Sequence, residues 1–322
     1  MRTKLQYLMT ATLVAVAQPA SAQSLEKVKV ATTFLGLWDT SQPSLCAERG
    51  EFAKAGLDVE VTSTRGGSEN VQAVVAGGMD VGYSPGINSV LAAATQGAAI
   101  KIISSEFRGQ NDSFFYVKAD SPIKSMDDLA GKSVAYSRPG GASEAILLAL
   151  EADRKIDLNL VIGGGMDATY TMAMTGQIDV GYAVPPTMLK EAEEGKIRVI
   201  FSGNDVESQR SMTQRLIIGS DDFVTNRRDV ATKFLETLDK CIDWAYANPD
   251  QSLEFYAKLN KVDPAIAKRG MEFYDRATLA FGPVQELDKG LKQAVAGGFI
   301  KAEPTEDELK KLMQILYTTP AK

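Results

Sequence analysis

The sequence predicts an α/β protein with two related lobes, and two observations carry that prediction. The pattern Gly-x-x-Asp-Val-Gly-Tyr occurs at residues 77–83 and again at 176–182, 99 residues further along the chain. Each copy follows an apolar helical pattern and enters a short strand-like run. Strand-like and helix-like segments alternate in the same order around both copies, which favours parallel β-α units. A chain of 322 residues has room for two such lobes.

The first lobe is expected over residues 23–112 plus 217–322. Its early helices are expected at 39–55, 68–76 and 84–96, with Gly56 ending the first and Ser68 capping the second. Five further helices are expected to complete this lobe, the last of them starting with a capping box at Thr305 and Glu308. Strands are expected at 28–33, 57–62, 80–83 and 100–104, and the later helices at 226–248, 249–259, 263–276, 284–297 and 305–317.

The second lobe is expected over residues 113–216. Two short apolar runs, 114–118 and 216–219, cross between the lobes, and we expect these two strands to form a hinge. The helices expected in this lobe end near residues 153, 175 and 194. Its strands are expected at 132–136, 158–162, 179–184 and 197–201.

Residues 1–22 are typical of a secretory signal peptide that is cut after Ala22. Arg2 and Lys4 give a basic start, an apolar run follows, and Ala20-Ser21-Ala22 has the small-x-small cleavage pattern. The apolar run is shorter than the roughly 20 residues that a membrane span requires. Removing the peptide leaves 33 Lys and Arg against 41 Asp and Glu, and this net charge of −8 disfavours nucleic acid as a partner.

The composition also restricts the chemistry. The chain contains no histidine, so it lacks the usual general base near neutral pH and the His-dependent zinc sites. We therefore expect no metal and no cofactor. The two cysteines are Cys46 and Cys241. Export would allow a disulfide between them, but two buried thiols are the commoner arrangement, and the sequence leaves both open.

The loops at the carboxyl ends of the strands are the expected ligand site, because ligands of open parallel sheets bind there. Glycines in such loops let the backbone approach a ligand, and free N–H groups at helix starts favour an anion. The best anion site is the loop 137–143, in which Arg138 can hold a carboxylate or sulfonate. The residues expected to bind the ligand are Leu35, Gly36, Trp38, Arg65, Gly67, Ser68, Tyr83, Ser84, Pro85, Arg138, Gly140, Gly141, Ala142, Ser143, Met166, Val184 and Pro185.

Aromatic side chains are expected to cover the rest of the ligand. Trp38 is the favoured aromatic wall. Tyr83, Tyr136 and Tyr182 end strands at the same edge, and each can face either the cleft or a core. Arg215 begins the returning strand and can also face the cleft.

One motif favours an enzyme instead. Residues 82–86 match G-x-S-x-G, the nucleophile elbow, in a strand–turn–helix context. A secreted serine hydrolase using Ser84 is therefore an alternative of another class. It lacks the histidine that would activate the serine, so we expect no enzyme and no catalytic residue.

Several segments together resemble the periplasmic solute-binding proteins of ABC importers. The chain is similar to the nitrate/sulfonate/taurine-binding group and to its thiamine-precursor-binding relatives of the NMT1/THI5-like superfamily. The segments that carry the resemblance are 46–60 (CAERGEFAKAGLDVE), 78–82 (GMDVG), 96–101 (QGAAIK), 123–132 (IKSMDDLAGK) and 176–182 (GQIDVGY).

The resemblance implies the type II periplasmic binding protein fold, in which two Rossmann-like lobes joined by two hinge strands close over one solute. It implies a periplasmic monomer that delivers its solute to an ABC transporter permease. We expect the solute to be a small organic anion, a carboxylate or sulfonate with an aromatic or apolar body. A neutral or cationic heterocycle, such as a thiamine pyrimidine precursor, is the alternative, and a sensing role beside a membrane receptor remains open. Some relatives are pyrimidine synthases that use a histidine and a cysteine-rich motif, and this chain has neither.

Overall fold

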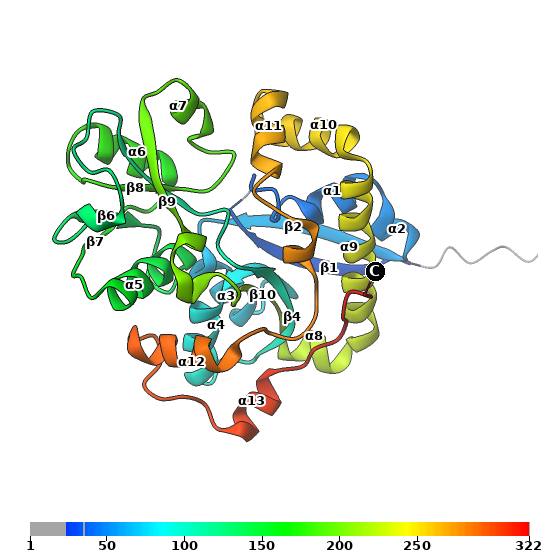
Figure 1. Cartoon of the computed structure of the whole chain (residues 1–322). Helices are drawn as coiled ribbons and strands as arrows, with labels where there is room; N and C mark the ends of the chain where they lie inside the picture. The colour runs from blue at the N-terminus through cyan, green and yellow to red at the C-terminus, as the bar shows by residue number, and fades with distance from the viewer. Residues whose placement is uncertain (1–23, 35, 322) are drawn as a thin grey trace, which may run out of the picture.

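The computed structural model describes residues 24–34 and 36–321 (Figure 1). The predicted signal peptide and Leu35 lie outside the described residues. Within the described part, helices and strands alternate as the sequence predicts, and the chain forms two α/β halves. In Figure 1 the green half carries β6 to β9, and the blue half is completed by the yellow and red C-terminal helices.

The first half contains a five-stranded sheet, and we call this sheet with its helices lobe 1. β1 pairs in parallel with β2 and β3, whereas β10 runs antiparallel between β3 and β4. Because β10 is paired on both sides, the returning chain is tied firmly into this sheet. In sheet order the strands are β2 (Leu57–Thr64), β1 (Glu26–Thr33), β3 (Val81–Gly86), β10 (Thr213–Ser220) and β4 (Ile100–Arg108).

The second half, called lobe 2, repeats this arrangement. β6 pairs in parallel with β7, and β5 runs antiparallel between β8 and β9. A bridge from Val134 to Val180 links the two groups of strands, which gives an order that matches lobe 1 strand for strand. The two Gly-x-x-Asp-Val-Gly-Tyr copies therefore lead into equivalent strands of different sheets. The order is β7 (Asn159–Ile162), β6 (Ser133–Tyr136), β8 (Gly181–Ala183), β5 (Phe114–Lys118) and β9 (Ile197–Ser202).

Helices cover both faces of the lobe 1 sheet. One face packs against α1, α2, α9 and α10, and the other against α3, α4, α12 and α13. Their bounds are α1 (Gln42–Glu48), α2 (Glu51–Lys54), α3 (Gly67–Val75), α4 (Ile87–Thr95), α8 (Asp221–Asn226), α9 (Arg228–Ala247), α10 (Pro249–Asn260), α12 (Leu287–Ala296) and α13 (Glu306–Leu312). The helices of lobe 2 are α5 (Ala142–Arg154), α6 (Met166–Met174) and α7 (Leu189–Glu193).

Some helix boundaries differ from the prediction. The first expected helix is divided into α1 and α2 at Gly50, whose φ of 70° does not fit a helix. Residues 84–86 continue β3, so α4 starts only at Ile87. The predicted capping box is confirmed, since Thr305 accepts from the Glu308 N–H and the Glu308 carboxylate accepts from Thr305.

One helix, α11 (Pro264–Met271), contributes to both lobes. Its Ile266 belongs to the apolar core of lobe 2, whereas the next residue, Ala267, belongs to that of lobe 1. Gly270 packs against Pro186 of lobe 2, and Arg269 pairs with Glu193 on α7. The lobes are therefore joined by packed side chains as well as by the two covalent crossings.

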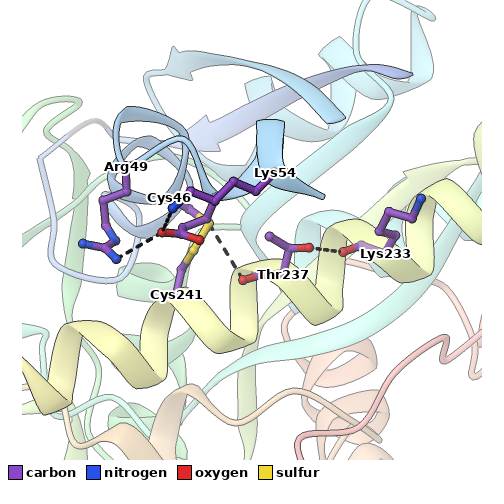
Figure 2. Close-up of a disulfide and its surroundings, with 7 residues drawn as sticks. Cys46, Arg49, Lys54, Lys233, Thr237 and Cys241 are labelled. Atoms are coloured by element: carbon purple, nitrogen blue, oxygen red, sulfur yellow. Dashed lines mark hydrogen bonds and ion pairs between the residues drawn. A yellow bond between two sulfur atoms is a disulfide. The ribbon is translucent and has the colours of Figure 1, made fainter. Parts of the chain in front are cut away.

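Cys46 and Cys241 form a disulfide between α1 and α9, so the two buried thiols that we considered commoner are not what the structure contains (Figure 2). Their Cα atoms lie 5.6 Å apart. α1 packs along α9, which brings residues 195 positions apart in sequence within bonding distance. The bridge fixes the start of lobe 1 to its C-terminal helices.

Candidate functional site

A small cavity lies between the two lobes, at the carboxyl ends of their strands. It encloses about 50 Å³ and takes its lining from both lobes. A larger groove of about 590 Å³ runs along the outside of the same seam, but it is open and no charged residue lines it. The cavity is lined by Thr33, Phe34, Leu37, Gly67, Ser84, Gly86, Ser113, Ser137, Gly141, Ala142, Ser143, Tyr182, Val184 and Arg215.

Three of the described helices begin at this cavity without a side-chain cap. The N-cap residues of α3, α4 and α5 are glycines, Gly66, Gly86 and Gly141, and none has a side chain that could accept from the first turn. The first N–H groups of a helix have no partner within it. Their partial positive charge therefore converges on the cavity from both lobes, which favours an anion there.

The structure brings part of the predicted site together. Six of the expected ligand residues line the cavity, and they come from both lobes. Ser84 adopts a φ of 67°, a left-handed conformation that is uncommon for a residue with a side chain and that occurs preferentially at functional sites. The six residues are Gly67, Ser84, Gly141, Ala142, Ser143 and Val184.

Trp38 is not the aromatic wall of this cavity, and that prediction is wrong. Its side chain is 1% exposed and lies in the lobe 1 core, edge-on to the rings of Tyr246 and Tyr256. Its indole Nε1 donates to the Tyr246 hydroxyl at 3.0 Å. Gln42 donates to the Trp38 carbonyl oxygen, which ties the loop to the start of α1.

Tyr83 and Arg65 also lie away from the cavity. Tyr83 is fully buried in the lobe 1 core, the second of the two positions considered for it. Arg65 points into solvent, where its guanidinium pairs with Glu69 one helical turn further on. Gly36 packs against the Asn260 side chain.

The other predicted residues lie beside the cavity without lining it. Met166 accepts from the Val184 N–H through its sulfur and so supports a lining residue. Arg138 is half-buried, packs over Gly66 of the opposite lobe, and keeps its Nε without a partner among the described residues. Pro85 adjoins Ser84, Pro185 adjoins Val184, and Ser68 and Gly140 lie in the adjacent groove.

Ser68 does not cap its helix as expected. α3 starts one residue earlier, and the Ser68 hydroxyl donates instead to the Pro139 carbonyl oxygen at 2.8 Å. Ser89 on α4 donates in the same way to the Gly140 carbonyl oxygen. Both bonds join lobe 1 to lobe 2, so these serines hold the lobes together around the cavity.

Sequence reasoning left eight lining residues out of the predicted set. Tyr182 and Arg215 were recognised as able to face the cleft, and both do. The Tyr182 hydroxyl donates to the Gly164 carbonyl oxygen at 2.6 Å. Thr33, Ser113 and Ser137 lie at or next to an end of a predicted strand, and this position could have identified them as lining residues. The eight are Thr33, Phe34, Leu37, Gly86, Ser113, Ser137, Tyr182 and Arg215.

The floor of the cavity is an ionic network centred on Arg215. Its Nη1 lies 3.0 Å from Asp39 Oδ2, and its Nη2 pairs with Asp112. Ser84 donates to the same Asp39 oxygen at 3.1 Å, and the Tyr274 hydroxyl donates to Asp112 at 3.1 Å. Among the described residues, Arg215 is the charged member of the cavity lining, and its charge is shared between two carboxylates.

Glu106 on β4 lies in the same buried region. Neither carboxyl oxygen makes a hydrogen bond of full geometry with a described residue, although the Ser84 and Tyr83 hydroxyls lie close enough to it to lower its pKa slightly. Burial raises its pKa well above the usual value, and repulsion from Asp39 adds to the rise, while Arg215 opposes it. Burial likewise raises the pKa of Asp39 in spite of its pairing with Arg215.

Neither a metal-binding cluster nor a membrane-spanning helix is present in the part of the chain that the structure describes. No group of three or more His, Cys, Asp or Glu side chains in residues 24–34 and 36–321 is arranged to hold a metal ion. In the same ranges, no helix combines the length and apolar character needed to cross a membrane.

The family of the chain follows from its sequence relatives. The model of the family described as NMT1/THI5 like matches residues 44–252, which is most of the described chain. The chain belongs to the NMT1/THI5-like family. A provisionally named binding protein of Brucella abortus is 30% identical over 234 residues, covering 71% of this chain and 70% of the relative. The 4-amino-5-hydroxymethyl-2-methylpyrimidine phosphate synthase of Saccharomyces cerevisiae is a more distant relative, 22% identical over 70% of this chain and 69% of its own.

Solved structures agree with the family on the fold. The periplasmic aliphatic sulphonate binding protein SsuA from Escherichia coli superposes with a TM-score of 0.74, covering 93% of this chain and 95% of that one at 16% identity. This likeness confirms the predicted periplasmic binding protein fold.

Proposed function

We propose that this NMT1/THI5-like protein is the extracytoplasmic solute-binding component of an ABC importer. In this proposal it captures a small organic anion, a carboxylate or sulfonate, in the cavity between its lobes and delivers it to a membrane permease. It acts in the periplasm as a binding protein and not as an enzyme. The fold and the names of the Brucella and SsuA relatives support the binding role.

One observation carries the choice of an anion: three uncapped helix N-termini meet at one cavity. α3 and α4 approach from lobe 1 and α5 from lobe 2. An anion between them would accept hydrogen bonds from both lobes at once, so its binding energy would favour the closed arrangement. Arg138, half-buried beside Tyr182, adds a positive charge at the same place.

The ligand class can be tested directly. A thermal-shift screen of the mature chain would compare alkanesulfonates, aliphatic and aromatic carboxylates, and pyrimidines. A ligand present at 100 times its Kd stabilises the folded state by about 2.7 kcal/mol, which gives a clear shift in Tm. Stabilisation by anions and not by pyrimidines is the expected result.

Two arginines supply a matched pair of variants. Arg138→Ala should weaken the binding of an anion found in the screen by about 1.5–3 kcal/mol, the range for a hydrogen bond to a charged group. Arg65→Ala is the control, because Arg65 was also among the residues expected to bind the ligand but points into solvent. Equal affinity of both variants, measured by calorimetry, would remove Arg138 from the site.

A second ligand class has its own support. Asp39 contacts the lining residues Ser84 and Arg215 and keeps a second carboxyl oxygen without a partner among the described residues, and this oxygen could accept from an N–H group of a neutral or cationic heterocycle. Phe34 and Tyr182 would then stack on its ring. Stabilisation by pyrimidines alone in the same screen would favour this alternative over the anion.

A further inference from the structure

The floor beneath the cavity contains three carboxyl groups and one guanidinium group, that of Arg215. Asp39 and Asp112 both pair with Arg215, and each keeps a second carboxyl oxygen without a partner among the described residues. Glu106 is the third carboxyl group; it has no cation of its own, and only the Ser84 and Tyr83 hydroxyls lie near its oxygens among the described residues. All three carboxyl groups are fully buried, at 0% exposure. A buried negative charge without a partner is costly, so this region favours extra protons.

The tyrosines and the arginine around the floor do not change their charge in the physiological range, so an extra proton would be bound by Asp39 or Glu106. Burial raises the pKa of each neighbouring tyrosine above its usual value, so these phenols stay neutral in the physiological range. The Arg215 guanidinium stays charged, because its pKa is held well above the ordinary value by the surrounding carboxylates against the opposing effect of burial. The groups that face Asp39 and Glu106 are Tyr83 from β3, Arg215 from β10, Tyr246 from α9, Tyr256 from α10, Asp112 from the β4–β5 connection and Tyr274 after α11.

The floor is in direct contact with the cavity. Ser84 lines the cavity and donates to Asp39 Oδ2, and Arg215 lines the cavity and pairs with that same oxygen. A charge placed in the cavity is therefore one residue away from Asp39. A solute anion would share a guanidinium that two carboxylates already neutralise, which makes the ionised form of the third carboxyl group still less favourable.

From this arrangement we propose that capture of an anionic solute is coupled to uptake of a proton by the Asp39–Glu106 floor. This inference rests on the proposed function. The proton comes from solvent and neutralises a carboxylate as the anion enters, so the net charge of the buried region changes little. By linkage, the affinity for an anion rises as the pH falls, by up to about tenfold per pH unit, in the range above the raised pKa of the free protein where the carboxyl group is still ionised before the anion enters. A neutral solute takes up no proton.

Proton uptake can be measured by calorimetry with ethanesulfonate, whose own charge is constant between about pH 5 and 8 since sulfonic acids are strong acids. The titration is repeated in Tris and in triethanolamine, because cationic buffers of different ionisation enthalpy report the number of protons taken up, and these two are neither sulfonates nor heterocycles that could compete for the cavity. Ethyl methyl sulfone, an uncharged analogue, is the ligand control. Glu106→Gln keeps the shape of the side chain and removes its titration.

The outcomes separate the two proposals. The expected result is proton uptake with ethanesulfonate, tighter binding at pH 6 than at pH 8, and a reduced proton count in Glu106→Gln. Binding without proton uptake and with the same Kd at both pH values overturns the coupling and leaves the proposed function intact. If ethanesulfonate does not bind at either pH, both proposals fail for sulfonates. The wild-type proton count decides the matter even if Glu106→Gln fails to fold.

Discussion

The hydroxyl of Ser89 on α4 donates to the carbonyl oxygen of Gly140 at 2.8 Å, and this bond crosses from one lobe to the other. Gly140 has a φ of 78°, and a Cβ there would lie 2.9 Å from the Ser89 oxygen. A glycine is therefore needed both for the backbone conformation and for the close approach. The bond lies next to the start of α5, so it stabilises the arrangement in which α5 faces α3 and α4.

Ser89→Ala should shift the protein toward an open form. A hydrogen bond of this kind contributes about 0.5–1.5 kcal/mol, so affinity for the solute should fall by the corresponding factor. The radius of gyration of the free protein from small-angle X-ray scattering should increase. Thr171→Ala is the control, since Thr171 bonds only within its own helix α6. Unchanged scattering and affinity would show that Ser89 does not hold the lobes closed.

Ala142→Pro tests the backbone donors at the cavity. Ala142 is the first residue of α5, where proline fits the helix but lacks the N–H. The preceding Gly141 is extended, with a ψ of 162°, as proline requires of its neighbour. Loss of this N–H should weaken anion binding by about 1.5–3 kcal/mol with little change in Tm.

The control for this variant is Glu306→Pro at the equivalent position of α13. Its preceding residue, Thr305, is also extended, with a ψ of 161°, and α13 lies away from the cavity lining. Calorimetry should show normal affinity for this control. If Ala142→Pro binds as tightly as the control, the α5 N-terminus is not part of the anion site.

Trp38→Phe should lower stability and leave affinity unchanged. The substitution removes the indole N–H that donates to Tyr246 in the core, which costs about 0.5–1.5 kcal/mol. Urea unfolding measures the first effect, and calorimetry with the solute measures the second. A large loss of affinity with normal stability would restore Trp38 to the binding site.

Removal of the disulfide should destabilise the protein. Cys46→Ala combined with Cys241→Ala frees a loop of 195 residues in the unfolded chain, and disulfides of this kind contribute about 2–4 kcal/mol. Dithiothreitol should lower the urea midpoint of the wild type and leave that of the double variant unchanged. Solute affinity should be retained, because neither cysteine lines the cavity.

The buried Glu106 predicts how stability depends on pH. Its pKa is raised in the folded state, so the folded protein binds a proton that the unfolded chain releases above the usual carboxyl pKa of 4.5. Stability should therefore fall as the pH rises from about 4.5 toward the raised pKa, by about 1.4 kcal/mol per pH unit. Glu106→Gln should show a flatter profile in urea unfolding between pH 5 and 8. A wild type with the same slope as the variant would contradict the assignment.

The strand–helix order and the place of the cavity could be predicted from sequence because they follow from local patterns. Parallel strands place their carboxyl ends at one edge, so the loops that follow them, including those after the two Gly-x-x-Asp-Val-Gly-Tyr copies, were expected to form the ligand site. Ser84 and Gly86 of β3 do line the cavity together with Tyr182 and Val184 of the second lobe.

The orientation of individual side chains could not be predicted in the same way. Tyr83 and Tyr182 occupy equivalent positions in the repeat and both belong to the core of their lobe, yet only Tyr182 of the two also lines the cavity. Trp38 turns inward because α9 and α10 supply Tyr246 and Tyr256 as partners from more than 200 residues away. Such long-range packing leaves no local sequence signal.

The placement of β10 also sets an order in which the protein can assemble. β10 lies between β3 and β4 although it follows them by more than 100 residues, so the lobe 1 sheet stays divided until residue 220 is available. The strands of lobe 2 come from one continuous stretch and can pair earlier. During synthesis or export from the N-terminus, the lobe that begins the chain is therefore the one completed last, and its disulfide closes only after Cys241 has arrived.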